Sequence, residues 1–108
     1  MMSELGRIAA AKVEPETAVR LDGGPDGICL VRIGDDFYAI SDRCSHADYS
    51  LSEGDIDPEE CWIECWKHGS AFSLRDGSPQ SLPATHPVPV YQVQREGDDV
   101  VVSDGDSP

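Results

Sequence analysis

The sequence lacks long apolar runs, and its longest stretches of apolar residues are only a few positions long. A helix that spans a membrane needs roughly 20 such residues in a row. The first residues, Met1–Arg7, also lack the basic start and the apolar segment of a secretory signal peptide. We therefore expect a protein that does not enter the membrane and that works in the cytoplasm.

Basic residues are scarce: 8 Lys and Arg stand against 21 Asp and Glu, which gives a formal net charge of −13 at pH 7. Because nucleic acids and anionic membrane surfaces are themselves negative, neither is an expected partner. The charge has two interpretations. It can simply keep a small protein soluble, or it can steer the protein toward basic patches on other proteins.

Helical periodicity is missing as well, since no window of ten or more residues repeats its apolar positions at helical spacing. Short apolar runs separated by Gly, Pro and Asp predict an all-β fold, and 108 residues predict one domain, residues 1–108. The segment 41–77 is rich in turns, Ser78–Pro87 is predicted to be an irregular covering loop, and residues 103–108 a frayed tail. Strands are expected at 7–11, 17–21, 28–33, 37–40, 88–93 and 100–102, with hairpin turns at 34–36 and around 96–98.

Two short segments carry the chemistry: Cys44-Ser45-His46 and Cys65-Trp66-Lys67-His68. A [2Fe–2S] cluster needs this set when one iron takes two thiolates and the other takes two imidazoles. A structural zinc site also uses two cysteines and two histidines, but it usually pairs like ligands at short spacing. Here each segment holds one of each, which favours the binuclear cluster. The predicted ligands are Cys44, His46, Cys65 and His68.

The remaining candidates have structural interpretations. Cys29 and Cys61 are predicted to be strand residues beside apolar neighbours, where a buried thiol behaves as a small apolar side chain. Disulfides are not expected, because no secretory signal indicates an oxidising compartment. His86 has no cysteine at ligand spacing and is interpreted as structural.

Continued through Gly69-Ser70, the two segments resemble the Rieske signature C-x-H … C-x-x-H-G-S. The resemblance covers residues 5–102 and is closest to the small ferredoxin components of multicomponent ring-hydroxylating oxygenases. It implies three antiparallel β-sheets with two cluster-binding loops at one tip, within about residues 41–77. It also implies that the two cysteines hold a buried iron, and that the two histidines hold an iron nearer the solvent.

The chain departs from high-potential Rieske proteins at three positions. Tyr49 and Lys67 stand where those proteins have a disulfide between the cluster loops, and Phe72 stands where they have a tyrosine that donates to a ligand sulfur. Ser70, another expected donor, is kept. Because hydrogen bonds to cluster sulfurs raise the potential, we expect a value on the order of −150 mV rather than +300 mV.

The resemblance implies a soluble one-electron carrier between an NAD(P)H-dependent flavin reductase and a terminal oxygenase. No second metal-ligand set and no nucleotide-binding loop is visible, so we do not expect an enzyme. Electrons would leave through His46 and His68, beside Trp66, which either covers the cluster or contacts a partner. The alternatives are a ferredoxin for iron–sulfur assembly or another redox pathway, a structural zinc domain, and a cluster-free protein like some nitrite reductase small subunits.

Overall fold

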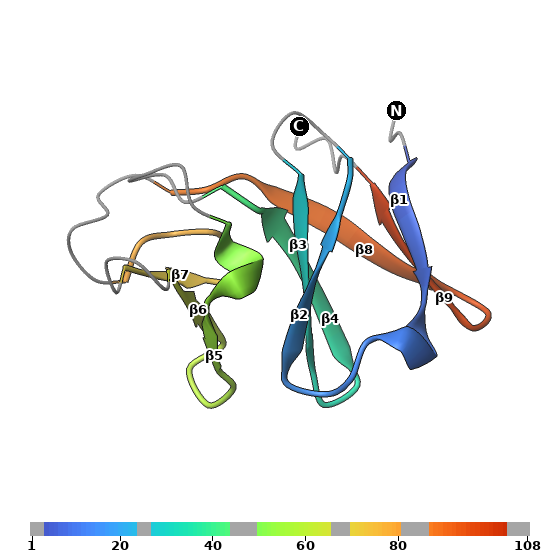
Figure 1. Ribbon diagram of the computed structural model, residues 1–108, viewed down its shortest axis with the longest axis horizontal. Helices are drawn as coiled ribbons and strands as arrows, with labels where there is room; N and C mark the ends of the chain where they lie inside the picture. Colours follow the sequence, from blue (N-terminus) through green and yellow to red (C-terminus); the bar gives the residue numbers. More distant parts are fainter. Residues whose placement is uncertain (1–3, 24–26, 44–49, 66–69, 81–86, 104–108) are drawn as a thin grey trace.

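The computed structural model describes residues 4–23, 27–43, 50–65, 70–80 and 87–103. Within these residues nearly all regular structure is β-strand (Figure 1), with only two short 3-10 turns, η1 (Ala10–Lys12) and η2 (Leu51–Glu53). This part of the chain contains no helix long and apolar enough to cross a membrane. The strands are β1 (Glu4–Ala9), β2 (Thr17–Leu21), β3 (Ile28–Ile33), β4 (Asp36–Ser41), β5 (Asp55–Asp57), β6 (Trp62–Glu64), β7 (Ala71–Ser73), β8 (Val90–Glu96) and β9 (Asp99–Ser103).

The strands form three antiparallel groups of three. β1-β9-β8 and β4-β3-β2 make one six-stranded sheet, and they are joined where Ala39 pairs with Tyr91 and Ile40 with Val90. The third group is the separate sheet β5-β6-β7, which lies to the left of the larger sheet in Figure 1. The predicted all-β class with three antiparallel sheets is therefore confirmed, with two of the three sheets joined at their corner.

β3 lies between two hydrophobic cores and contributes buried side chains to both. Cys29 and Val31 face the core shared with the three-stranded sheet, whereas Ile28 and Leu30 face the core inside the six-stranded sheet. All four side chains are fully buried. This explains why β3 is a continuous apolar run rather than an alternating one, since a strand covered on both faces has no solvent side. Burial of each large branched side chain contributes about 1.5–3 kcal/mol to folding.

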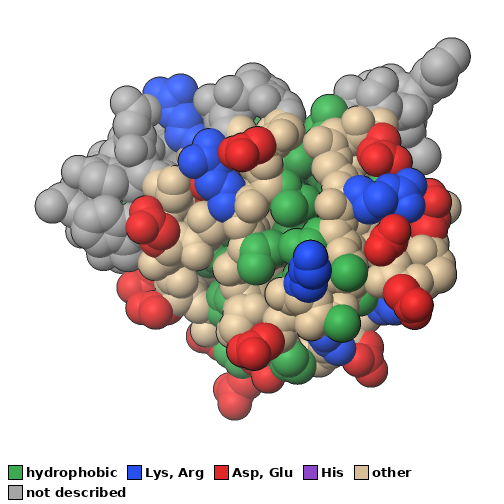
Figure 2. Space-filling model, turned by 45° about the vertical axis from the view of Figure 1, so that its right-hand side comes forward, with side chains coloured by type: hydrophobic (Ala, Val, Ile, Leu, Met, Phe, Trp, Pro, Cys, Tyr) green, Lys and Arg blue, Asp and Glu red, His purple; other side chains and the backbone are tan. Residues whose placement is uncertain are grey.

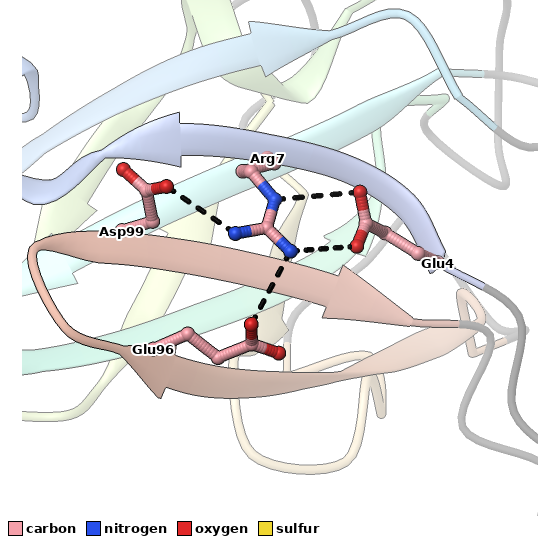
Figure 3. A network of polar contacts seen from close by, with 4 residues as sticks. All are labelled: Glu4, Arg7, Glu96 and Asp99. Carbon is pink, nitrogen blue, oxygen red and sulfur yellow. Dashed lines mark hydrogen bonds and ion pairs between the residues drawn. The ribbon is translucent and has the colours of Figure 1, made fainter.

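The edge of the six-stranded sheet is tied together by a charge network around Arg7 of β1 (Figure 3). Its guanidinium donates to Glu4 at 3.0 Å, to Glu96 at 3.3 Å and to Asp99 at 3.3 Å. The bond with Glu4 is the largest reason that the pKa of Arg7 is raised. Because the network is exposed, its main effect is to offset the repulsion among three neighbouring carboxylates.

Several predicted boundaries are confirmed and others are wrong. The strands at 17–21 and 28–33 match β2 and β3, and both hairpin turns are present, at 34–35 and 97–98. The sequence pattern does not predict β5 and β7, because each has three residues and neither carries a long apolar run, and it indicates β6 only through the strand expected around Cys61. Ala10 and Ala11 belong to the turn η1 rather than to a strand.

Two residue-level predictions are corrected. Cys61 is not a strand residue: it lies in the turn before β6 with a positive φ of 62°, and its carbonyl accepts the N–H of Leu74 at 2.8 Å. Ser103 is not frayed, because it is the last residue of β9, pairs with Glu4 and Gln92, and is buried. The rest of the predicted tail, 104–108, lies outside the described residues.

Candidate metal centre

The residues on either side of 44–49, the stretch that contains the first predicted ligand segment, pair with each other. We call such a pair of flanking residues the base of a loop. Arg43 and Ser50 form an isolated antiparallel bridge on either side of residues 44–49. Just below this bridge, the carbonyl of Asp42 accepts the N–H of Leu51 at 2.7 Å, and its carboxylate accepts the N–H of Ser52 at 2.7 Å. Cys44 and His46 themselves lie outside the described residues. The chain thus leaves and returns at one fixed place.

The second segment has a similar base. Cys65 follows β6 directly, and its N–H donates to the carbonyl of Ser70 at 2.7 Å, closing the segment 66–69. The thiol of Cys65 is fully buried in the core that also contains Ile63 and Phe72. His68, Trp66 and Lys67 lie outside the described residues. Of the four predicted ligands, only Cys65 therefore lies among the residues that the structure describes.

A third loop, the predicted covering loop Ser78–Pro87, starts beside the second. Pro79 bridges to Phe72, and the N–H of Gln80 donates to Ala71 at 2.7 Å. The N–H of Val88 donates to the carbonyl of Gly77 at 2.9 Å and closes the loop. At its start, Asp76 accepts the hydroxyl of Ser78 at 2.6 Å, and this bond holds the pKa of Asp76 below its usual value. Residues 81–86, including His86, lie outside the described residues.

One core holds the three loop bases together. Leu51 from the first base, Cys65 from the second and Val88 from the third belong to the same buried cluster. The described ends of the loops accordingly meet beside the three-stranded sheet (Figure 1). A buried thiol at this meeting point, with a second cysteine and two histidines on the loops, is a soft sulfur and nitrogen donor set that suits iron–sulfur ligation.

Two neighbours of Cys65 bear on the chemistry of the site. Ser70 and Phe72 are both fully buried. Phe72 pairs with Ile63 across β6 and β7, and its ring has no hydrogen-bond donor. The position that would hold a donating tyrosine in a high-potential protein is therefore filled here by an apolar side chain packed in the core.

The structure supports the interpretation of Cys29 and Cys61 as structural residues. Burial raises the pKa of the Cys29 thiol well above its ordinary value, with a smaller contribution from the charge of Asp42, so this thiol stays neutral. Cys61 is buried as well and hydrogen-bonds with Tyr38, and this bond is the largest reason that the pKa of Tyr38 is raised. Both cysteines pack in the core and carry no disulfide.

The structure also shows an acidic hollow that the sequence interpretation missed. It has a volume of about 630 Å³ and lies on the outer face of the three-stranded sheet, beside the strand that leads to Cys65. The alternation in Asp55-Ile56-Asp57 was the available signal, because it puts both carboxylates on one face. The lining combines four acidic residues, Asp55, Asp57, Glu59 and Glu64, with the apolar residues Ile56, Pro58, Trp62 and Ala71.

Comparison with known proteins identifies the family. The sequence profile of the Rieske [2Fe–2S] domain matches residues 6–92. The chain belongs to the Rieske [2Fe–2S] family. The cofactor of such a domain is a single [2Fe–2S] cluster, which the donor set and the buried thiol of Cys65 fit.

Among the relatives that the chain resembles are ferredoxin components of dioxygenases. The chain is 38% identical over 94 residues to the ferredoxin component of biphenyl 2,3-dioxygenase from Rhodococcus jostii, which covers 87% of this chain and 86% of that protein. Among solved structures, the ferredoxin of carbazole 1,9a-dioxygenase from Nocardioides aromaticivorans is 33% identical with a TM-score of 0.85, over 94% of this chain and 96% of that one. A complex of reduced oxygenase and oxidized ferredoxin in carbazole 1,9a-dioxygenase contains a chain that is 40% identical with a TM-score of 0.80, over 87% of this chain and 95% of that one.

Proposed function

We propose that this protein, residues 1–108 as one Rieske domain, is the one-electron carrier of a multicomponent oxygenase system. Cys44 and Cys65 would hold one iron of the cluster, and His46 and His68 the other. The observation that carries the proposal is the geometry of the loop bases: Arg43–Ser50 and Cys65–Ser70 close the two ligand segments, and one core holds them together.

The cluster supplies a reversible one-electron change, and the chain supplies its surroundings. Cys65 follows the end of β6 and its N–H donates to the Ser70 carbonyl, so its backbone is held in place, and its side chain is buried. The apolar core around it excludes water from the thiolate side. Rigid ligands of this kind need little rearrangement when the charge changes. In this proposal the protein transfers electrons and does not itself transform a substrate.

The proposed partners are a flavin-containing NAD(P)H reductase, which gives the electron, and a terminal oxygenase, which takes it. Relatives named as ferredoxin components of dioxygenases support this, and so does the oxygenase–ferredoxin complex of carbazole 1,9a-dioxygenase. The net charge of −13 favours partners with basic docking patches. Because NAD(P)H is the electron source, we place the protein in the cytoplasm.

A reconstituted electron-transfer chain tests this function. The purified protein is mixed anaerobically with NADH and the reductase component of a biphenyl dioxygenase system, and bleaching of the visible absorbance is followed. The reduced protein is then mixed with the oxygenase component or with cytochrome c. We expect reduction by the reductase and reoxidation by the acceptor.

Two variants serve as controls in that assay. His68→Ala should lose the cluster and the transfer, whereas Cys61→Ser, which alters a buried thiol that is not one of the proposed ligands, should keep both. A loaded wild-type protein that neither accepts nor passes on an electron would contradict the proposal.

A further inference from the structure

Asp42 stands out in the described part of the chain, because it is the only charged side chain there that is buried, with 2% of its surface exposed. It lies two residues before Cys44, a distance that the backbone can stretch to about 7 Å at most. A buried carboxylate is costly unless its contacts compensate for the lost water. The contacts of Asp42 therefore indicate its role in the protein.

Asp42 contacts three other segments of the chain, which contain Gly27, Leu51–Ser52 and Arg20. Its N–H donates to the carbonyl of Gly27 at 3.1 Å, and its carbonyl accepts the N–H of Leu51 at 2.7 Å. One carboxylate oxygen, Oδ1, accepts the N–H of Ser52 at 2.7 Å. The other, Oδ2, lies 3.4 Å from Nε of Arg20. The side chain thus bridges the returning end of the first cluster loop and strand β2.

The cation in this arrangement is only partly buried. The side chain of Arg20 is 52% exposed, so solvent weakens its compensation of the buried carboxylate. Its path lies over Gly27, where a Cβ would come within 2.9 Å of Nε. The absence of a side chain at Gly27 therefore leaves room for the guanidinium to reach Asp42.

The loop base alone does not require a charge here. An asparagine oxygen could accept the N–H of Ser52 equally well, without the cost of burying a carboxylate. What the carboxylate adds is a fixed negative charge in a low-dielectric place close to the first cluster loop. A negative charge near the cluster disfavours the addition of an electron.

We propose that Asp42 is a positioning residue for the first cluster loop and that its buried charge lowers the reduction potential of the cluster. Arg20 opposes this charge and raises the potential. The inference rests on the proposed function, in particular on Cys44 as a ligand in that loop.

The test compares midpoint potentials of cluster-loaded variants, measured by redox titration in one and the same buffer. Asp42→Asn should keep the cluster and shift the midpoint to a more positive value. Arg20→Gln, which leaves the carboxylate in place, should shift it to a more negative value. Asp35→Asn is the control, because Asp35 is exposed and paired with Arg32 in a distant hairpin turn, and it should leave the midpoint unchanged.

The opposite signs distinguish the proposal from a merely structural role. If Asp42→Asn and Arg20→Gln shift the midpoint in the same direction, or if neither shifts it, the charge effect is refuted. Should Asp42→Asn fail to load, Arg20→Gln still decides the matter by its sign.

The positioning role has its own readout, the iron content of Asp42→Ala. Removing the acceptor of the Ser52 N–H should lower iron occupancy well below that of Asp42→Asn, and full occupancy would refute this role. A wild-type protein without any iron–sulfur cluster would refute the proposed function itself, whereas a normal cluster with unshifted variants refutes only this inference.

Discussion

Phe72 is the residue on which the predicted low potential most directly depends. Its ring is fully buried in the core that contains Cys65, and it lies two positions after Ser70. The two neighbours of Cys65, the proposed ligand, thus differ in kind, since Ser70 has a hydroxyl and Phe72 cannot donate a hydrogen bond. We expect the low end of the Rieske range for this reason, on the order of −150 mV.

Phe72→Tyr should therefore raise the midpoint potential, because a new hydroxyl near the ligand sulfur stabilises the reduced cluster. The measurement is a redox titration of the loaded variant. Phe37→Tyr is the control: Phe37 packs against the other core, and its substitution should not move the midpoint. An unchanged midpoint in a fully loaded Phe72→Tyr protein would count against this reason for the predicted low potential.

Single residues also differ in whether their roles can be predicted from the sequence. The ligand set can be proposed from the sequence, because cysteine and histidine at this spacing have few other uses. The role of Asp42 cannot, since its burial depends on Arg20, Gly27 and Ser52, which meet only after the sheet has formed. The apolar neighbours of Cys61 predict a strand there, but Cys61 lies in a turn, and the positive φ that it adopts belongs to that turn.

At the scale of elements, the loop bases depend on close backbone approach. Gly77 has a φ of 75°, and a Cβ there would overlap the carbonyl oxygen of Val88. Gly97, in the turn between β8 and β9, has a similar φ of 62° but nothing within 4 Å of a Cβ. The two glycines share a backbone conformation and differ only in what surrounds them.

Gly77→Asn should lower the free energy of unfolding by about 1–3 kcal/mol, the usual cost of forcing atoms into a packed site. Gly97→Asn should change it by no more than about 0.5 kcal/mol, because asparagine tolerates a positive φ and the site is open. Chemical denaturation of both variants measures the difference. Equal losses would show that backbone conformation, and not the approach of Val88, is what matters at position 77.

The strands also differ in how well they can be predicted from the sequence. β3 could be predicted to the residue, because burial on both faces makes it a continuous apolar run. β5, β6 and β7 could not, since each contributes three residues and only Ile63, Ala71 and Phe72 of their side chains are buried. These short strands position Cys65, so the part of the fold nearest the site was the least predictable.

At the scale of the whole molecule, the dominant property is its negative charge. The net charge is −13, and acidic side chains are spread over the visible face in Figure 2 rather than gathered in one patch. Acidic side chains also line the hollow beside the strand that leads to Cys65. A field of this kind speeds encounters with basic partners and orients them only weakly.

The second-order rate constant for reduction by the flavin reductase should fall several-fold as ionic strength rises from about 0.01 M to about 0.1 M, because the Debye length shrinks from about 30 Å to about 10 Å. Stopped-flow absorbance measures this rate. Electron transfer within the preformed complex, the first-order step, should stay nearly constant. A second-order rate that is flat or rises with salt would contradict electrostatic steering.

We propose that one [2Fe–2S] cluster is held by two thiolates and two imidazoles, and the proposed function depends on this ligand set. Electron spin-echo envelope modulation of the dithionite-reduced protein tests it most directly, because it detects nitrogen nuclei bound to the paramagnetic cluster. We predict an EPR signal with couplings from two histidine nitrogens, which is lost in His68→Ala and unchanged in Cys61→Ser. An EPR-silent protein that contains zinc, or a cluster signal without nitrogen coupling, would contradict the account.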